Sequence, residues 1–574
     1  MLLILELAVV KVLCISLLAT VSVNCAQNVT YSVVSYSSSE RHSLAVMIDN
    51  DKTLYPLSVS AETPYIFTGS APMATIGYKY ATISNFKQKH IEPFSRAPVI
   101  NSSYNEVYGI SMNRYPVPEL PQMFPPLSSI DRLSSGIHKD DQIPTLFLSG
   151  SKADVSNIHS NVYSKIKINL NLTYIGLSEV HALNAVEIKI SGRGTRFSPK
   201  ASYKLDFGKK GNLFGYRRLK LRSLSTDPTY IREKICYDMI NSFGLASSGF
   251  SYVRVFINNK PYGLFGLQED FDEAWLANEF NHGDKENYNQ GTLYTGKSRA
   301  GLRYLGENET LYVLADNPFK QPTYEIEEAP RKSGVKSAGS FRRLIDFTKF
   351  LTNAPSTEPN AVALWNQQID TESVLRSLAL ELFLGNSDGY ITAGNNYNLF
   401  TNANQNDQLV FIPSDMDMTL GSSSLYGINT TLYQKFEDHP EFNSSRPLFY
   451  NILKVPEFKL IFNGMVASAF SNLDLLYSRI NALSSLINED VSSDVSIVRN
   501  YVVLPPFFIG QQLIKVAIKE GPFGDEGAFL DYFSRTQKEK FPFEVAINGT
   551  INKPSLMGLK QWISMSANSY LKSK

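Results

Sequence analysis

The order in which two hydrophobic periodicities appear along the chain most constrains its fold. Apolar and polar residues alternate in short runs from Gln27 to about Asn101 and again between Gln142 and Arg222, whereas later segments repeat apolar residues every three to four positions. Alternation with period two is typical of strands with one buried face, and the longer period is typical of helices. The sequence therefore predicts an α+β chain, β-rich first and mainly helical afterwards.

The first alternating region predicts a small β-sandwich domain over residues 27–110. Turn residues separate five runs that each suit a half-buried strand: VTYSVVSYS, HSLAVMID, YPLSVSAE, PYIFTG and TIGYKYATI. The proline-rich, polar stretch 111–141 is predicted to be a linker or a wrapping loop. A second, larger domain is predicted over residues 142–574.

The larger domain opens with five further strand-like runs: IPTLFLSG, SKIKINLNLTYIG, NAVEIKISGRG, ASYKLDF and RRLKLRSL. Residues 228–244 predict a helix, which begins after a proline, ends at Gly244 and has an apolar stripe through Ile231, Ile235, Met239 and Ile240. FSYVRVFINNKPYGLFGLQEDF predicts a hairpin, and GSFRRLIDFTKFLTN and DTESVLRSLALELFLGN predict long helices.

Residues 1–26 have the character of a secretory signal peptide. An apolar run follows Lys11 and ends in small residues at Cys25 and Ala26, although Glu6 leaves an uncleaved anchor open. Seven N-x-[ST] sequons agree with a secreted or cell-surface glycoprotein, at Asn28, Asn101, Asn171, Asn308, Asn429, Asn443 and Asn548. No hydrophobic tail that would signal a lipid anchor is expected, and no membrane span beyond the signal peptide.

Composition excludes several classes of protein. A net charge of +1 gives no sign of a nucleic-acid partner, because phosphate backbones attract a strong excess of Lys and Arg. Outside the signal peptide only Cys236 remains, so the fold is expected to depend on core burial rather than disulfides, with Cys236 as a buried apolar residue. The seven histidines lack metal-ligand spacing, which argues against a zinc hydrolase.

The segment GNSDGY, residues 385–390, supports two exclusive hypotheses. It fits the G-x-S-x-G elbow, with Ser387 as a nucleophile, or it presents Asp388 as a catalytic acid upstream of Asn395 and Asn396. An elbow needs a strand before the serine and a helix after it. Here a helix is predicted before Ser387 and none after it, which favours Asp388.

Two further carboxylates follow at short range. The apolar run LVFIP is predicted to be a strand that delivers Asp415 and Asp417 to one side. Carboxylate oxygens presented together suit Mg²⁺ or Mn²⁺ carrying nucleotide phosphates, although a solvated turn is the plainer alternative. Protein kinases use the same order: a catalytic Asp, a metal-binding Asn, then a metal-binding Asp.

A nucleotide site also needs positive charge. The segment SGRGTRFSPKASYKLDF has Gly192 and Gly194 in a turn, followed by Lys200 and Lys204, which alternate onto one face of a predicted strand. Either lysine could reach a phosphate; the alternative is an ordinary basic hairpin.

Taken together, these segments resemble the CotH-like atypical protein kinases, named after a bacterial spore coat protein. From about Ile143 to the mid-400s the resemblance depends on five blocks in order: GRGTRFSPKASYKLDF, LRSLSTDPTYIREKICYDMI, VRVFINNKPYGLFGLQEDFDEAWL, SDGYITAGNNYNLF and FIPSDMDMTLG. The chain is most similar to secreted CotH-like proteins of mucoralean fungi.

The resemblance implies a kinase-like two-lobe domain that transfers the γ-phosphate of ATP, with Mg²⁺ or Mn²⁺, to serine or threonine of secreted or coat proteins. It implies Asp388 as the catalytic residue and a metal site of Asp415, Asp417 and Asn396. The implied cofactor-binding residues are Lys200, Lys204, Arg222, Arg232, Glu269 and Asn396. Glu269 and Asp272 match a recurring acidic pair, and Arg222 and Arg232 match recurring basic positions. For all four, hairpin–helix salt bridges are the alternative. The H-R-D triplet of ordinary kinases is replaced by NSD.

A second class of function stays open. Fungal members of the resembled family are also associated with attachment to host cells, which needs no phosphate transfer. A cell-surface adhesin, invasin or pseudokinase that binds a host-cell receptor or the cell wall would suit the same scaffold.

Overall fold

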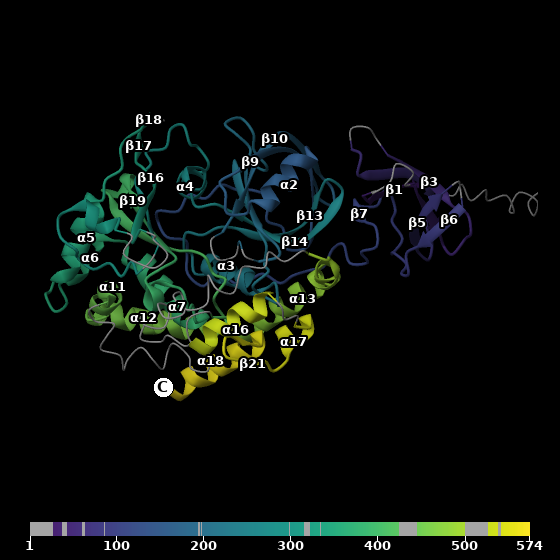
Figure 1. Cartoon of the computed structure of the whole chain (residues 1–574). Coiled ribbons are helices and arrows are strands. Elements are labelled where there is room, and N and C mark those ends of the chain that lie inside the picture. Colours follow the sequence, from purple (N-terminus) through teal and green to yellow (C-terminus); the bar gives the residue numbers. More distant parts are fainter. Residues whose placement is uncertain are drawn as a thin grey trace, which may run out of the picture. The chain divides into compact units, whose positions relative to one another are not determined.

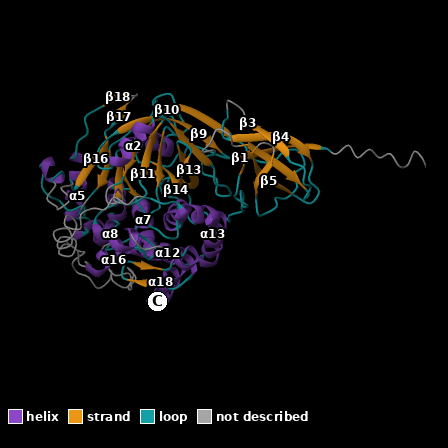
Figure 2. Cartoon of the chain, turned by 45° about the vertical axis from the view of Figure 1, so that its right-hand side comes forward, coloured by secondary structure: helices purple, strands orange, loops and turns teal. Residues whose placement is uncertain are grey.

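The computed structural model describes residues 27–36, 43–59, 63–84, 87–192, 196, 198–297, 299–314, 322–332, 335–423, 445–499, 526–537 and 541–573. The predicted signal peptide, Gly194, and the sequons at Asn429 and Asn443 lie outside these residues. The chain divides into two compact units, Met1–Asn113 and Arg114–Lys574. Figures 1 and 2 show the elements of each unit.

The first unit is a seven-stranded sheet in the order β6-β5-β2-β3-β4-β1-β7. Tyr31 of β1 and Tyr78 of β5 have ring centroids 4.8 Å apart, although three strands separate β1 from β5 in the sheet. The sheet must therefore fold back on itself, so that its two halves enclose one apolar core, as in a sandwich. The strands are β1 (Asn28–Val34), β2 (Ser43–Ile48), β3 (Tyr55–Val59), β4 (Ile66–Pro72), β5 (Tyr78–Ser84), β6 (Lys87–Ile91) and β7 (Glu106–Val107).

The second unit begins with a closed barrel of seven strands, in the order β10-β11-β12-β14-β13-β8-β9. Alternate side chains of its strands fill the interior, which explains the period-two pattern of the sequence. β8 and β13 are parallel, and the other neighbouring strands are antiparallel. The strands are β8 (Thr145–Ser149), β9 (Lys167–Ile175), β10 (Val180–Ser191), β11 (Ser202–Asp206), β12 (Arg218–Arg222), β13 (Phe250–Ile257) and β14 (Lys260–Glu269).

Three helices accompany the barrel: α2 (Lys152–Ser160), α3 (Arg232–Ser242) and α4 (Glu273–Phe280). The predicted helix over 228–244 is α3, and its four stripe residues and Cys236 are buried, as expected. The predicted hairpin is β13 and β14, joined by Asn258 and Asn259, both at positive φ. This two-residue turn is tighter than the predicted connection, because asparagine tolerates the left-handed conformation.

A four-stranded sheet and most of the helices form the rest of the second unit. The sheet order is β16-β15-β19-β20, with β15 (Leu293–Gly296), β16 (Tyr324–Glu328), β19 (Tyr397–Asn402) and β20 (Gln408–Pro413). Two short hairpins are β17 (Arg331–Lys332) with β18 (Val335–Lys336), and β21 (Asn552–Lys553) with β22 (Leu556–Met557). The helices are α5 (Arg342–Thr352), α6 (Ala361–Gln368), α7 (Thr371–Leu384), α8 (Tyr390–Ala393), α11 (Pro447–Ile452), α12 (Pro456–Ala469), α13 (Leu473–Ser496), α16 (Glu526–Gln537), α17 (Phe543–Asn548) and α18 (Leu559–Ser573).

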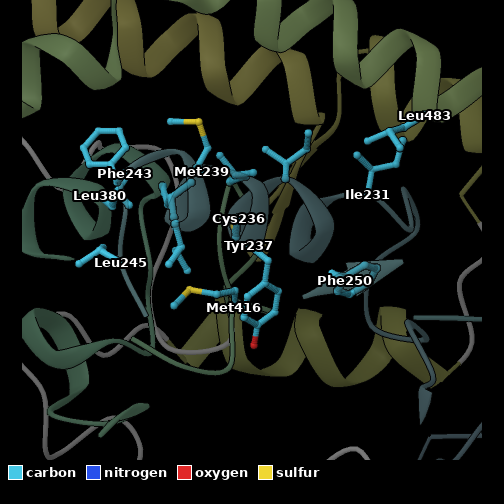
Figure 3. Packing of buried hydrophobic residues seen from close by; sticks show 14 of the residues in the cluster. Ile231, Cys236, Tyr237, Met239, Phe243, Leu245, Phe250, Leu380, Met416 and Leu483 are labelled. Atoms are coloured by element: carbon cyan, nitrogen blue, oxygen red, sulfur yellow. The ribbon is translucent and has the colours of Figure 1, made fainter. Parts of the chain in front are cut away.

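The largest apolar cluster joins the barrel side of the unit to its helical side. It contains residues of α3, the C-terminal end of α7, strands β19 and β20, α13 and α18. Figure 3 shows Met416 with Tyr237 and Cys236 of α3 in this cluster. The mixed α+β composition predicted from the sequence is confirmed. In the described ranges, no helix has the length and apolar character needed to cross a bilayer.

The proline-rich stretch after Arg114 runs along the second unit. Met123 N donates to Ser242 O at 2.8 Å, and Leu127 N donates to Gly244 O at 2.9 Å, both at the end of α3. Asp131 N donates to Glu279 O of α4 at 3.0 Å. The backbone of this stretch is thus tied to two helices of the second unit.

Candidate functional site

The loop that carries Asp388 joins α7 to the one-turn helix α8. Gly385 ends α7 in the left-handed conformation, with φ 59°. Asn386 Oδ1 accepts a hydrogen bond from Asp388 N at 3.1 Å, and Glu381 Oε1 accepts one from Ile391 N at 2.6 Å. The loop is therefore fixed at both ends by side chains close to it in the sequence.

Two buried side chains, those of Glu381 and Arg446, form hydrogen bonds with the backbone of α8, where this loop ends. Burial raises the pKa of Glu381 to about 8. Arg446 Nε donates to Tyr390 O at 2.7 Å and Ile391 O at 3.0 Å, and its Nη2 donates to Thr392 O at 2.9 Å. Arg446 therefore pairs the carbonyls of Ile391 and Thr392 and shares that of Tyr390 with Gly394 N, at the end of a helix that has only one turn. Neither Glu381 nor Arg446 was singled out from the sequence, since each lies outside the motifs.

Both carboxylate oxygens of Asp388 accept hydrogen bonds from side-chain amides. Asn395 Nδ2 donates to Oδ1 at 3.1 Å, and Asn396 Nδ2 donates to Oδ2 at 2.8 Å. Asn395 Oδ1 is buried and has no hydrogen-bond partner among the described residues. The paired asparagines hold the half-buried carboxylate of Asp388 in one orientation and leave an amide oxygen beside it.

The D-x-D carboxylates converge on Arg222, the last residue of β12. Arg222 Nη2 lies 2.8 Å from Asp415 Oδ1 and 2.7 Å from Asp417 Oδ2. The side chain of Asp415 is 43% exposed, whereas those of Asp417 and Arg222 are 10% and 6% exposed. Met416, between the two acids, packs into the core (Figure 3). The two carboxylates thus share one guanidinium on the side away from that core.

The local backbone differs from the predicted strand. β20 ends at Pro413, and Asp415 has φ 53°, so the acids follow the strand in an irregular loop. Ser414 N donates to Asn396 O at 3.0 Å, which joins the D-x-D loop to the asparagine pair. Burial, then the charge of Asp415, raise the pKa of Asp417 to about 7 against the lowering effect of Arg222, and the charge of Asp388 also raises it.

Glu233 of α3 completes the charged cluster. Arg222 Nε lies 2.8 Å from Glu233 Oε2, and Gln268 Nε2 of β14 donates to Glu233 Oε1 at 2.8 Å. Glu233 is buried, with the amide and the guanidinium as partners. Glu233 was not predicted as a site residue, although it directly follows Arg232, which was. One strand, one helix and the D-x-D loop therefore meet through a single arginine.

Ser387 has none of the surroundings of a nucleophile. Helix α7 precedes it, and its hydroxyl donates to Met418 O at 3.2 Å in a buried position. The short helix α8 after it was not expected from the sequence. It has a single turn, and it contains the β-branched residues Ile391 and Thr392 and ends at Gly394, which are all poor helix formers. An elbow needs a strand before the serine, so the backbone here does not have that form.

The two predicted lysines contact different acids. Lys200 Nζ lies 2.8 Å from Asp494 Oδ1 of α13 and donates to Leu264 O at 2.5 Å, in a position where burial lowers its pKa to about 8. Lys204 forms an ion pair with Asp270, which follows β14. The sequence could not indicate Asp494, because 294 positions separate it from Lys200.

The remaining predicted residues lie in other polar networks. Arg232 is fully buried; it pairs with Asp227 and donates to Leu420 O at 3.1 Å and Met557 O at 2.6 Å. Burial raises the pKa of Glu269 to about 8.

Asp272, the other member of the predicted acidic pair, caps α4 through the N–H groups of Ala274 and Trp275. It also lies 3.0 Å from Arg218. A salt bridge between the strand and the helix is therefore present at Asp272.

The oxygen donors of this site suit a cation that takes most of its ligands from water and phosphate. Within the described ranges, no three His, Cys, Asp or Glu side chains are placed to hold a metal ion together. Asp415 and Asp417 with the amide oxygens of Asn395 and Asn396 are hard oxygen donors. Mg²⁺ commonly binds one or two carboxylates and completes its shell with water and phosphate oxygens. These residues suit such an ion better than an ion enclosed entirely by protein.

The barrel, the second sheet and the cluster around Arg222 define an α+β protein with an acidic, oxygen-rich site. A family model described as CotH kinase protein matches residues 188–513, which is more than half of the chain. The chain belongs to the CotH family.

Two relatives from the fungus Rhizopus delemar extend the similarity. Invasin CotH2 is 26% identical over 444 residues, which cover 76% of this chain and 70% of the relative. Invasin CotH3 is 25% identical over 500 residues, which cover 85% and 79%. The inner spore coat protein H of Bacillus subtilis is 23% identical over 272 residues, which cover 45% of this chain and 68% of the relative.

Proposed function

We propose that this chain is a secreted or cell-surface atypical protein kinase, which transfers the γ-phosphate of ATP to serine or threonine of secreted or coat proteins. The observation that carries the proposal is that Asp388 and its asparagine pair are joined, through Asn396 and Ser414, to the loop whose D-x-D carboxylates pair with Arg222. The description of the matching family and the spore coat and invasin names of the relatives agree with this activity and location.

The order of elements supports a kinase-like two-lobe arrangement. Strands β10, β11 and β12 are followed by α3 and then by β13 and β14. In protein kinases a lysine of the third strand pairs with a glutamate of the next helix. Here Arg222 of the third of these strands pairs with Glu233 of α3 at 2.8 Å. We infer that Arg222 takes the place of the kinase lysine, since Lys200 is paired with Asp494 instead.

In the proposed reaction, Asp388 orients the acceptor hydroxyl and receives its proton. A bond forms between that oxygen and the γ-phosphorus, the bond to the β–γ bridging oxygen breaks, and ADP leaves. Mg²⁺ or Mn²⁺ held at Asp415, Asp417 and Asn396 would neutralise phosphate charge. Asn395 and Asn396 keep Asp388 oriented, and Arg222 keeps the two D-x-D carboxylates together without a metal.

Labelled-phosphate transfer and thermal shift with Mg²⁺–ATP or Mn²⁺–ATP test the proposal. Wild-type protein should incorporate phosphate and melt at a higher temperature with metal–ATP, because a ligand of the native state stabilises it. Asp388→Ala should keep the shift and lose about 10²–10⁴-fold in transfer. Asp417→Ala should lose the shift. Ser387→Ala is the matched control and should transfer phosphate far better than Asp388→Ala.

The invasin names of the two fungal relatives favour a second candidate function, binding to a host-cell surface. Binding would require no phosphate transfer. A wild-type protein that adheres to host cells, yet shows neither a metal–ATP shift nor phosphate incorporation, would be a binding protein on this scaffold. Adherence that is equal in wild type and Asp388→Ala, with transfer lost only in the variant, would mean that both functions are present.

A further inference from the structure

The loop that follows Asp417 is held by residues near the C-terminus. Ser423 N donates to Ser555 O at 3.0 Å, and Met557 N donates to Gly421 O at 2.8 Å. The described C-terminal residues, from Glu526 onward, follow the region matched by the family model, which ends at residue 513. Residues beyond the matched region are therefore in direct contact with the loop of the candidate site.

Arg535 of α16 is the centre of this contact. It is 4% exposed, and its Nη2 donates to Ser422 Oγ at 3.0 Å while its Nη1 donates to Thr226 O at 3.0 Å. Its Nε donates to Ser555 Oγ at 2.7 Å, and Asp531 Oδ2 accepts a hydrogen bond from the same hydroxyl at 2.7 Å. A planar guanidinium with its donors in a fixed fork is suited to connecting several partners at once.

Tyr532 lies one turn before Arg535 on the same helix and packs against its guanidinium. Its ring centroid lies 4.9 Å from Cζ of Arg535, and the residue is 8% exposed. Burial raises the pKa of the phenol, and the charges of Asp417 and Asp388 raise it further. Tyr532 thus packs on the arginine that holds the loop after Asp417. Figure 1 shows α16 and α18 among the helices of the second unit.

We propose that the C-terminal segment Glu526–Ser573 is a built-in part of the nucleotide site, in which Arg535 is a positioning residue. By holding Ser422 and Ser555 together, Arg535 fixes the loop Met418–Ser423 and through it Asp417. This inference deepens the proposed function and rests on it for the identity of the ligand, Mg²⁺–ATP. The contact between the loop and the segment is a property of the fold and can be measured without nucleotide.

The test compares Arg535→Gln with Lys560→Gln in the full chain. Lys560 of α18 is a matched control, because its Nζ donates to Asn481 of α13 and to Asn548 of α17, both outside the loop 418–423. Arg535→Gln should speed amide hydrogen exchange in residues 418–423 by about tenfold or more and leave exchange in the barrel strands unchanged. Its affinity for Mg²⁺–ATP should fall about tenfold or more, whereas Lys560→Gln should match the wild type.

Each outcome decides the proposal. Unchanged exchange in residues 418–423 would overturn it, and so would faster exchange with unaltered Mg²⁺–ATP affinity. If wild-type protein binds no Mg²⁺–ATP, the proposed function fails, and the exchange measurement alone decides whether Arg535 holds the loop. If Arg535→Gln does not fold, Ser422→Ala removes a single hydroxyl from the same contact and should show the same local change to a smaller extent.

Discussion

At Arg222, one guanidinium contacts three carboxylates from two different parts of the chain. Glu233 comes from the helix after β12, and Asp415 and Asp417 come from the loop after β20. Burying carboxylates without a counter-ion costs free energy, and Arg222 is the cation that the buried Glu233 and the largely buried Asp417 share. Arg222 therefore links the stability of the second unit to the geometry of its candidate site.

Arg222→Met should lower the free energy of unfolding by about 3–5 kcal/mol, because it leaves buried carboxylates without their partner. Arg222→Lys should have an intermediate effect, since a compact ammonium cannot span the same acids. Urea unfolding measures both. Arg342→Met is the control: Arg342 also pairs with two carboxylates, Glu307 and Asp346, but its side chain is 54% exposed. An equal loss in the two methionine variants would contradict the role given to burial.

Glu381 predicts a pH dependence of stability. Its pKa is raised from 4.5 to about 8 in the folded chain, so the folded state keeps a proton that the unfolded state releases in that window. The free energy of unfolding should therefore fall as the pH rises from 4.5 to 8, by up to about 1.4 kcal/mol per pH unit from this group. Glu381→Gln cannot titrate and still accepts the bond from Ile391, so its stability should fall less.

Unfolding in urea at three pH values between 5 and 8.5 makes the comparison. The wild type and Glu381→Gln should have similar stability at the lowest pH, and the variant should be the more stable at the highest. Parallel curves would show that the proton on Glu381 does not contribute.

The central site residues could be predicted because they lie close together in the sequence. The partners of other site residues could not, because they come from distant parts of the chain. Asp388, Asn396, Asp415 and Asp417 lie in two motifs separated by one hairpin, so their meeting follows from local chain geometry. The partner of Lys200 comes from a helix far along the chain, and no sequence pattern identifies it. Whether these residues bind nucleotide and metal stays a prediction.

Among the elements, α7 shows how a helix end can set the position of a loop. Its C-cap residue, Gly385, has φ 59°. A Cβ added there would clash with the ring of Trp562. The glycine thus serves both a left-handed turn and a close approach to α18.

Gly385→Ala should therefore lower the free energy of unfolding by more than the roughly 1–2 kcal/mol of the left-handed conformation alone. Gly464→Ala is the opposite case: it lies within α12 with no atom within 4 Å of the added Cβ, and should stabilise by about 0.5–1 kcal/mol. Chemical unfolding of both variants checks the signs. Two changes of the same sign would contradict this account.

Hydrophobic periodicity predicted the barrel strands and several helices, because an element with one buried face has apolar residues at regular spacing. The barrel strands, α3, α5 and α7 all lie where alternation or helical spacing placed them. Helices α2, α4 and α8 were not predicted, since they have nine, eight and four residues and are too short to show a clear helical repeat. The closure of the barrel was also beyond prediction, because periodicity does not specify which strands pair.

At the scale of the molecule, α13 connects the barrel to the helical side of the second unit. Asp490 pairs with Arg254 of β13 at 2.5 and 2.8 Å, and Asp494 pairs with Lys200 at 2.8 Å. Arg479 pairs with Asp238 of α3 at 2.8 Å. Three ion pairs along one helix thus fix its position against the strands.

Asp490→Ala should cost about 3–5 kcal/mol of unfolding free energy, because it leaves Arg254 buried without a counter-ion. The double variant Arg254→Met/Asp490→Leu should lose much less than the sum of the two single changes. Urea unfolding completes the cycle. Arg114→Met, in a pair whose side chains are 59% and 32% exposed, is the control and should change stability little. Additive losses in the cycle would show that the pair does not act as a unit.

The strand order of the barrel also has a consequence for how a newly made chain folds. β9 to β12 can pair as soon as they are synthesised, and β8 joins β9, but β8 and β12 each keep one open edge until the hairpin of β13 and β14 arrives. That hairpin inserts between them, and Arg254 then reaches Ile143 across 111 positions of sequence. Until then the two edges can recruit strands from other chains. Sealing of the barrel is therefore a late, non-local step, and the interval before it is when the nascent chain is most prone to aggregate.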